Sequence, residues 1–145
     1  MRTIQMLLLL MTVCYAETSI DKLVGTWKLN AAQSKTRDTA DQIMKIEKVG
    51  PNTIRVSIDR TTKSGEKRST QYTRICDGKE HHSEGPAPDI METCDPNTLN
   101  VLMKRNGTPS GELHLSIAPD GKSHTVTRKS LRNDQPEETL VFDRQ

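Results

Sequence analysis

The sequence predicts an all-β fold, a single antiparallel up-and-down β-barrel of about eight or nine strands. Three segments alternate apolar and polar residues, as a strand does when one face lies in a core and the other in water; they are 53–59, 99–104 and 112–117. Clusters of Gly, Pro, Asn and Asp separate these and other segments rich in Val, Ile and Thr, which is typical of hairpin turns. Open sheet edges promote aggregation. A sheet with this many strands and one buried face must therefore curl into a barrel or split into a sandwich.

Residues 1–16 predict a secretory signal peptide. Arg2 precedes a mostly apolar run over 4–13, and small residues follow at 14–16, the order that export signals have. The run is too short to cross a bilayer as a helix, so no membrane span is expected. Cys14 leaves open a lipoprotein cleavage site, although Val13 stands where a small residue is required. We expect a secreted or periplasmic protein with one domain over 17–145.

Along that domain the elements are expected in the following order. Residues 18–24 form a turn or two of helix, and 31–41 is polar and short enough to be a loop. Strands are expected at 26–30, 43–49, 53–59, 68–76, 90–94, 99–104, 112–117, 123–131 and 139–144. The inward faces are expected to gather around Trp27 and to come from Ile54, Val56, Ile58, Leu99, Val101, Met103, Leu113, Leu115, Ile117, Leu140 and Phe142.

Charge and composition exclude nucleic acid as a partner. The formal net charge is +2, from 21 basic and 19 acidic residues, whereas a nucleic-acid-binding domain is far more basic. The basic residues within 55–74 are interrupted by Asp59 and Glu66 and have no aromatic platform for bases. Aromatic residues make up only 3% of the chain, so the core is expected to be thin. Separately, we expect the protein to be a monomer.

A more specific signal is the sequence LVGTWKLN at 23–30. Gly-x-Trp at the start of the first strand resembles the opening motif of lipocalins and fatty-acid-binding proteins, which are calycin-like barrels. In such a barrel Gly25 lets the chain turn tightly and Trp27 plugs one end. Together with Ser34-Lys35, DGK at 77–79 and 120–122, and VFDRQ at 141–145, the motif resembles a family of small secreted bacterial lipocalin-like proteins.

The resemblance implies further features. In lipocalins an arginine of the last strand packs over the motif tryptophan, which implies Arg144 or Arg128 over Trp27. A fatty-acid-binding protein carries two short helices between its first two strands, and residues 37–42 leave no room for such a pair. The resemblance therefore supports the fold more strongly than a lipid ligand.

Cys76 and Cys94 predict a disulfide, because they are an even pair in an exported chain. They fall near the ends of successive predicted strands. Two buried thiols, or one reactive thiol, are the alternatives.

No catalytic or metal site is expected. His81 and His82 are adjacent on a turn or strand, so their side chains point in opposite directions and cannot share an ion without a bend. His114 and His124 fall on neighbouring strands and could pair across a hairpin. The sequence lacks the common hydrolase, zinc-protease and phosphate-loop motifs. The Asn106-Gly107-Thr108 sequon has meaning only in a eukaryotic host.

The predicted function is noncovalent binding or carriage of a small amphiphilic or apolar molecule, without a cofactor and without catalysis. Met44, Tyr72, Arg74 and Met103 are expected to line the ligand space. The alternative is a non-enzymatic structural or interaction module of the cell envelope whose barrel is filled by its own side chains. An enclosed space of roughly 300 Å³ or more favours binding.

Overall fold

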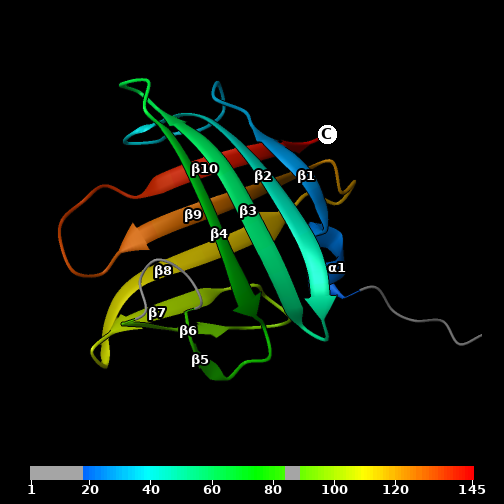
Figure 1. The fold of residues 1–145 in the computed structure, drawn as a ribbon, viewed down its shortest axis with the longest axis vertical. Helices are drawn as coiled ribbons and strands as arrows, with labels where there is room; N and C mark the ends of the chain where they lie inside the picture. Colours follow the sequence, from blue (N-terminus) through cyan, green and yellow to red (C-terminus); the bar gives the residue numbers. More distant parts are fainter. Residues whose placement is uncertain (1–17, 84–88) are drawn as a thin grey trace, which may run out of the picture.

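Ten antiparallel strands and one short helix make up the part of the chain described by the computed structural model, residues 18–83 and 89–145 (Figure 1). The elements are α1 (Ser19–Leu23), β1 (Gly25–Leu29), β2 (Thr39–Gly50), β3 (Thr53–Thr62), β4 (Lys67–Ile75), β5 (Glu80–His82), β6 (Ile90–Cys94), β7 (Val101–Arg105), β8 (Thr108–Ile117), β9 (Ser123–Ser130) and β10 (Glu138–Arg144). None of the helical residues described here belongs to a helix long and apolar enough to span a membrane. The predicted signal peptide, including Cys14, lies outside the described residues.

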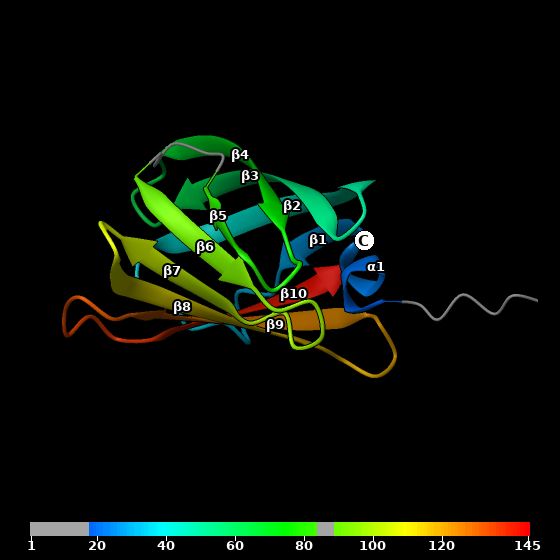
Figure 2. The same ribbon diagram turned by 90° about the horizontal axis from the view of Figure 1, so that it is seen from below.

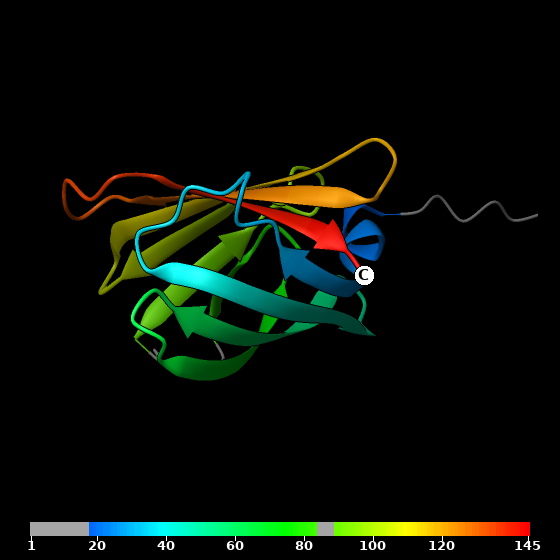
Figure 3. The ribbon, with the colours of Figure 1, turned by 90° about the horizontal axis from the view of Figure 1, so that it is seen from above.

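The strands form one sheet in the order β4-β3-β2-β1-β10-β9-β8-β7-β6-β5. The first strand therefore pairs with the last, and the free edges are β4 and β5. Figures 2 and 3 show β1–β4 as one wall of the barrel and β7–β10 as the facing wall. The predicted count of about eight or nine strands was too low. The strand missed is β5, which has only three residues, Glu80–His82, and so no room for an apolar alternation.

The strands run alternately up and down, so successive connections lie at opposite ends of the barrel. The two ends differ because α1 lies at one of them (Figure 1). At one end, called the closed end below, lie α1 and the turns and loops at 51–52, 76–79, 95–100 and 118–122 (Figure 1). At the opposite end, called the mouth below, lie the connections 30–38, 63–66, 106–107 and 131–137. Ile20 and Leu23 of α1 are each 1% exposed, so the helix is packed against the core at the closed end (Figure 2).

Trp27 is fully buried at the closed end. Its Nε1 donates a hydrogen bond to the Leu23 carbonyl at 2.8 Å, and the Arg144 guanidinium lies 4.1 Å from its ring centroid. Arg144, rather than Arg128, therefore covers the indole. Gly25 has a φ of +144°, and a Cβ there would come within 2.5 Å of Arg144 Nη1. The Gly-x-Trp motif thus leaves the space that the arginine occupies.

We predict that Arg144→Met lowers the free energy of unfolding by about 1–2 kcal/mol, because the cation–π contact is lost. Carbonyls of Lys22, Val24 and Gly121, each 2.8 Å from an Arg144 nitrogen, also lose their donor. Urea unfolding measures the effect. Arg132→Met, on an exposed loop residue, is the control, and equal stabilities of the two variants would contradict the prediction.

The edge strands β4 and β5 are not paired by backbone hydrogen bonds in the described residues. At this gap, side chains link β4 to β6. Cys76, directly after β4, forms the predicted disulfide with Cys94 at the end of β6. Arg74 Nε and Nη2 donate to the Glu92 carboxylate at 3.1 and 3.2 Å. A covalent bond and an ion pair therefore hold together the part of the barrel that backbone pairing leaves open.

Candidate functional site

A cavity of about 370 Å³ occupies the half of the barrel nearer the mouth, and it is called the mouth cavity below. Its walls are formed by seven strands. Along each of them the inward-facing residues that line the cavity alternate with outward-facing residues. The lining residues are Gln42, Met44, Ile58, Arg60, Arg68, Thr70, Met103, Leu113, Val126, Arg128, Leu140 and Phe142. The space is thus built on the same face that forms the core.

Apolar side chains make up seven of these lining residues. Met44 lies opposite Ile58 across β2 and β3, and Leu140 lies opposite Val126 across β10 and β9. Phe142 is 1% exposed and lies on the same inward face, toward the closed end. The deeper part of the mouth cavity therefore suits an apolar group.

Met103 depends on a glycine opposite it. Gly111 is its partner across β7 and β8, and a Cβ at that glycine would come within 2.9 Å of the Met103 Cε. The glycine therefore gives the methionine side chain room beside the cavity.

Three arginines line the mouth cavity together with these apolar groups, and none of its lining residues is acidic. Arg60 and Arg68 face each other directly across β3 and β4, an arrangement in which like charges repel. Arg68 donates to both carboxylate oxygens of Glu66, at 2.9 and 2.8 Å. Arg60 makes no ion pair in the part of the chain that the structure describes. The cavity thus presents positive charge at its outer end.

The third arginine, Arg128, is balanced by Glu138, which lies opposite it on β10. The Glu138 carboxylate is 3.6 Å from Arg128 Nε and 3.0 Å from Arg37 Nη2. Burial raises the pKa of Glu138, but the Arg37 hydrogen bonds and the Arg128 charge outweigh that effect and lower its pKa overall. The carboxylate is therefore ionised and held between two cations.

Two of the four predicted ligand residues, Met44 and Met103, line the mouth cavity. Tyr72 and Arg74 continue the inward row of β4 toward the closed end, and Arg74 is held by Glu92 with its guanidinium 5.0 Å from the Tyr72 ring. Sequence analysis did not single out Arg60 as a cavity residue. The alternation over 53–59 already contained the signal, because its continuation puts residue 60 on the same face as Ile58.

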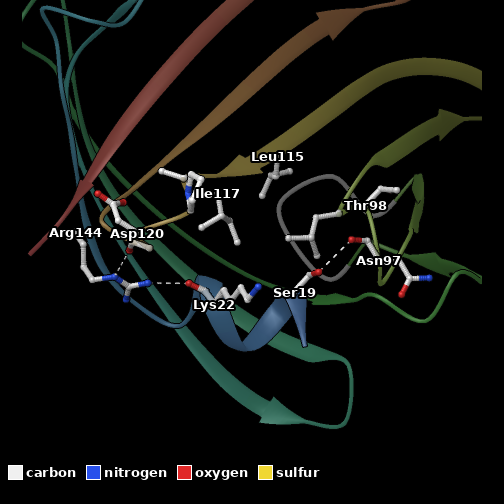
Figure 4. A pocket seen from close by; sticks show the side chains of 12 residues that line it. Ser19, Lys22, Asn97, Thr98, Leu115, Ile117, Asp120 and Arg144 are labelled. Atoms are coloured by element: carbon white, nitrogen blue, oxygen red, sulfur yellow. Dashed lines mark hydrogen bonds between the residues drawn. The ribbon is translucent and has the colours of Figure 1, made fainter. Parts of the chain in front are cut away.

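A second hollow, of about 530 Å³, lies at the closed end between α1 and the loops before β7 and after β8. Figure 4 shows that its arginine, Arg144, is bonded to the backbone. Ser19 likewise donates to the Asn97 carbonyl at 3.1 Å. The polar groups drawn there are thus largely engaged in joining α1 and the C-terminal strand to the neighbouring loops.

The histidines differ in their surroundings. His81 contacts the Asp77 carboxylate at 2.9 Å, and the exposed His114 contacts Asn100 at 3.0 Å. His124 is buried opposite Ile117, so it does not pair with His114 across the hairpin. No group of three metal-ligating side chains occurs among the residues the structure describes.

Comparison with known proteins relates the fold but not the sequence. No protein-family model matches the chain. No curated protein matches it in sequence. Among solved structures, the fluorescent protein UnaG superposes with a TM-score of 0.60 at 14% identity, covering 87% of this chain and 99% of that one. A point mutant of UnaG superposes with a TM-score of 0.61 at 14% identity, covering 87% of this chain and 98% of that one.

The fold is therefore an all-β, calycin-like barrel. The resemblance to lipocalins and fatty-acid-binding proteins holds for the architecture, without membership of a sequence family being shown. Between β1 and β2, where a fatty-acid-binding protein carries two helices, residues 30–38 form turns and bends with one isolated bridge. No helix from this connection covers the mouth.

Proposed function

We propose that the protein binds a small amphiphilic or apolar molecule noncovalently in the mouth cavity, without catalysing a reaction. The observation that carries this proposal is the space of about 370 Å³ lined by seven apolar side chains. Ligand sites are commonly concave, mostly apolar and supplied with a few polar groups. An envelope module with a filled barrel would lack this space. Met44 and Met103 would contact the ligand, while Tyr72 and Arg74 would hold the wall beside it.

We further propose that the protein works outside the cytoplasm. Disulfides persist in oxidising compartments, and Cys76 and Cys94 form one here. The signal peptide expected over residues 1–16 would deliver the chain there.

Filling the mouth cavity is expected to abolish ligand binding. Val126→Phe would extend an aromatic ring into the space, whereas Val49→Phe alters a side chain on a residue that is 42% exposed. Melting temperatures are measured with fatty acids, retinoids, haem and quinones. A ligand at one hundred times its Kd is expected to raise the melting temperature of the unaltered protein on the order of 10 °C.

The same rise is expected for Val49→Phe and none for Val126→Phe. A flat response of the unaltered protein across the whole panel, or an equal response of both variants, would contradict the proposal.

A further inference from the structure

Positive charge at the mouth carries information about the ligand. Arg60 and Arg68 lie directly opposite each other on β3 and β4 and both line the mouth cavity. Like charges in this position repel. The Arg68 side chain is 50% exposed, whereas Arg60 is partly buried. None of the lining residues is acidic, so the cavity wall offers Arg60 no carboxylate, whereas Glu66, outside the lining, pairs with Arg68.

Arg60 is the arginine with unused hydrogen-bonding capacity. Arg68 is paired with Glu66, but both side chains are at least half exposed, and because an exposed ion pair contributes little a ligand oxyanion can take the place of Glu66. Arg128 is balanced by Glu138. Arg60 has no ion-pair partner within residues 18–83 and 89–145, and its neighbour across β2 is the neutral Gln42. A guanidinium offers a planar fork that matches an oxyanion in bidentate fashion.

The apolar lining indicates how the rest of the ligand lies. Arg60 and Arg68 come from the mouth ends of β3 and β4, whereas Met44 and Phe142 lie nearer the closed end. A ligand with an oxyanion at one end can therefore place that end at the mouth and its apolar part inward. A water molecule occupies about 30 Å³ in the liquid, so the cavity holds roughly a dozen groups of that size, about the bulk of a ten-carbon chain.

We infer that the ligand is an anionic amphiphile of medium length, with a carboxylate or phosphate head on Arg60 and Arg68 and a chain of about ten carbons directed toward Phe142. This inference rests on the proposed function and names the chemical class of its ligand. Affinity then rises roughly fourfold for each added methylene that is buried, and it stops rising once the cavity is full.

Isothermal titration calorimetry at pH 7.5 on the disulfide-bonded protein tests the inference. The probes are octanoate, decanoate, tetradecanoate, decyl phosphate, 1-decanol and decylamine. We expect decanoate or decyl phosphate to bind roughly tenfold more tightly than decanol and decylamine to bind most weakly. Whichever oxyanion binds more tightly identifies the head group. Tetradecanoate is expected to gain little over decanoate.

Arg60→Met is the decisive variant. It should remove the roughly tenfold preference for decanoate over decanol and leave the affinity for decanol unchanged, and the ligand-free variant should be at least as stable as the unaltered protein. Arg55→Met, on an exposed residue of the same strand, should change neither affinity. If Arg60→Met does not fold, Arg68→Met is expected to show the same selective loss.

The outcomes separate the inference from the proposed function. Equal affinity for decanol and decanoate, or tighter binding of decylamine, would overturn the inference and leave a ligand-binding barrel. Selective loss for both arginine variants but not for Arg55→Met would support it. Binding of none of the six probes would overturn the proposed function together with the inference.

Discussion

Replacing Glu92 with alanine is expected to lower the free energy of unfolding by about 3–5 kcal/mol. The side chains of Arg74 and Glu92 are only 8% and 12% exposed, so the variant would leave a buried guanidinium without its anion. Burial opposes the charge on Arg74, but Tyr72 and Glu92 more than offset it and raise the pKa of Arg74 above its ordinary value. The arginine therefore stays charged and must be solvated at the cost of local structure.

Urea unfolding of single and double variants isolates the pair. Arg74→Met with Glu92→Met should recover most of the loss, because replacing both partners of a buried ion pair with apolar residues is often neutral or stabilising. Glu47→Ala removes a carboxylate 3.1 Å from Lys45 on the exposed face of β2 and should cost less than about 1 kcal/mol. A Glu92→Ala loss no larger than that of Glu47→Ala would show that the pair does not hold β4 to β6.

Most strands follow from the sequence because one buried face imposes a period of two. All nine predicted segments coincide with strands, from β1 at Gly25–Leu29 to β10 at Glu138–Arg144. Their ends are less predictable. β2 begins at Thr39 rather than 43, and its added residues include the polar Gln42, which is buried. The segment expected from 99 begins as β7 at Val101, because Leu99 has a φ of +58° that ends the preceding loop.

The mouth cavity could be predicted only in part. Methionines on inward positions, such as Met44 and Met103, follow from the alternation, and both line the space. The alternation that partly buries Ile58 also assigns Arg60 to the inward face, but no local pattern shows which residue lies opposite Arg60. The pairing of Arg60 with Arg68 depends on the register between β3 and β4. Register comes from long-range packing and is not encoded in any one segment.

Acidification from pH 7 to pH 4 is expected to cost about 3 kcal/mol of stability through His124 alone. Burial, with a smaller contribution from the Arg144 charge, lowers the pKa of His124 from 6.5 to about 4. In the unfolded chain the imidazole takes up its proton near pH 6.5, so between the two values the unfolded state binds more protons. Stability therefore falls as the pH falls, by ~1.4 kcal/mol for each unit of that interval.

The structure explains why His124 resists protonation. The residue is 1% exposed, and neither ring nitrogen has a hydrogen-bond partner among the described residues. Its ring lies edge-to-face with Trp27, with centroids 4.3 Å apart, and stacks on Phe142 at 4.9 Å. An imidazolium there would have no acceptor in contact, so the charge is more stable in water after unfolding.

His124→Leu should remove this part of the pH dependence, because leucine keeps an apolar side chain in the site and cannot titrate. Urea unfolding at several values from pH 7 to pH 4 measures the difference in slope between the variant and the unaltered protein. That difference excludes the contributions of Glu138 and other carboxylates, which both proteins share. His114→Leu, at an exposed histidine, should retain the full loss. If His124→Leu loses stability on acidification as steeply as His114→Leu, another group is responsible for the acid sensitivity.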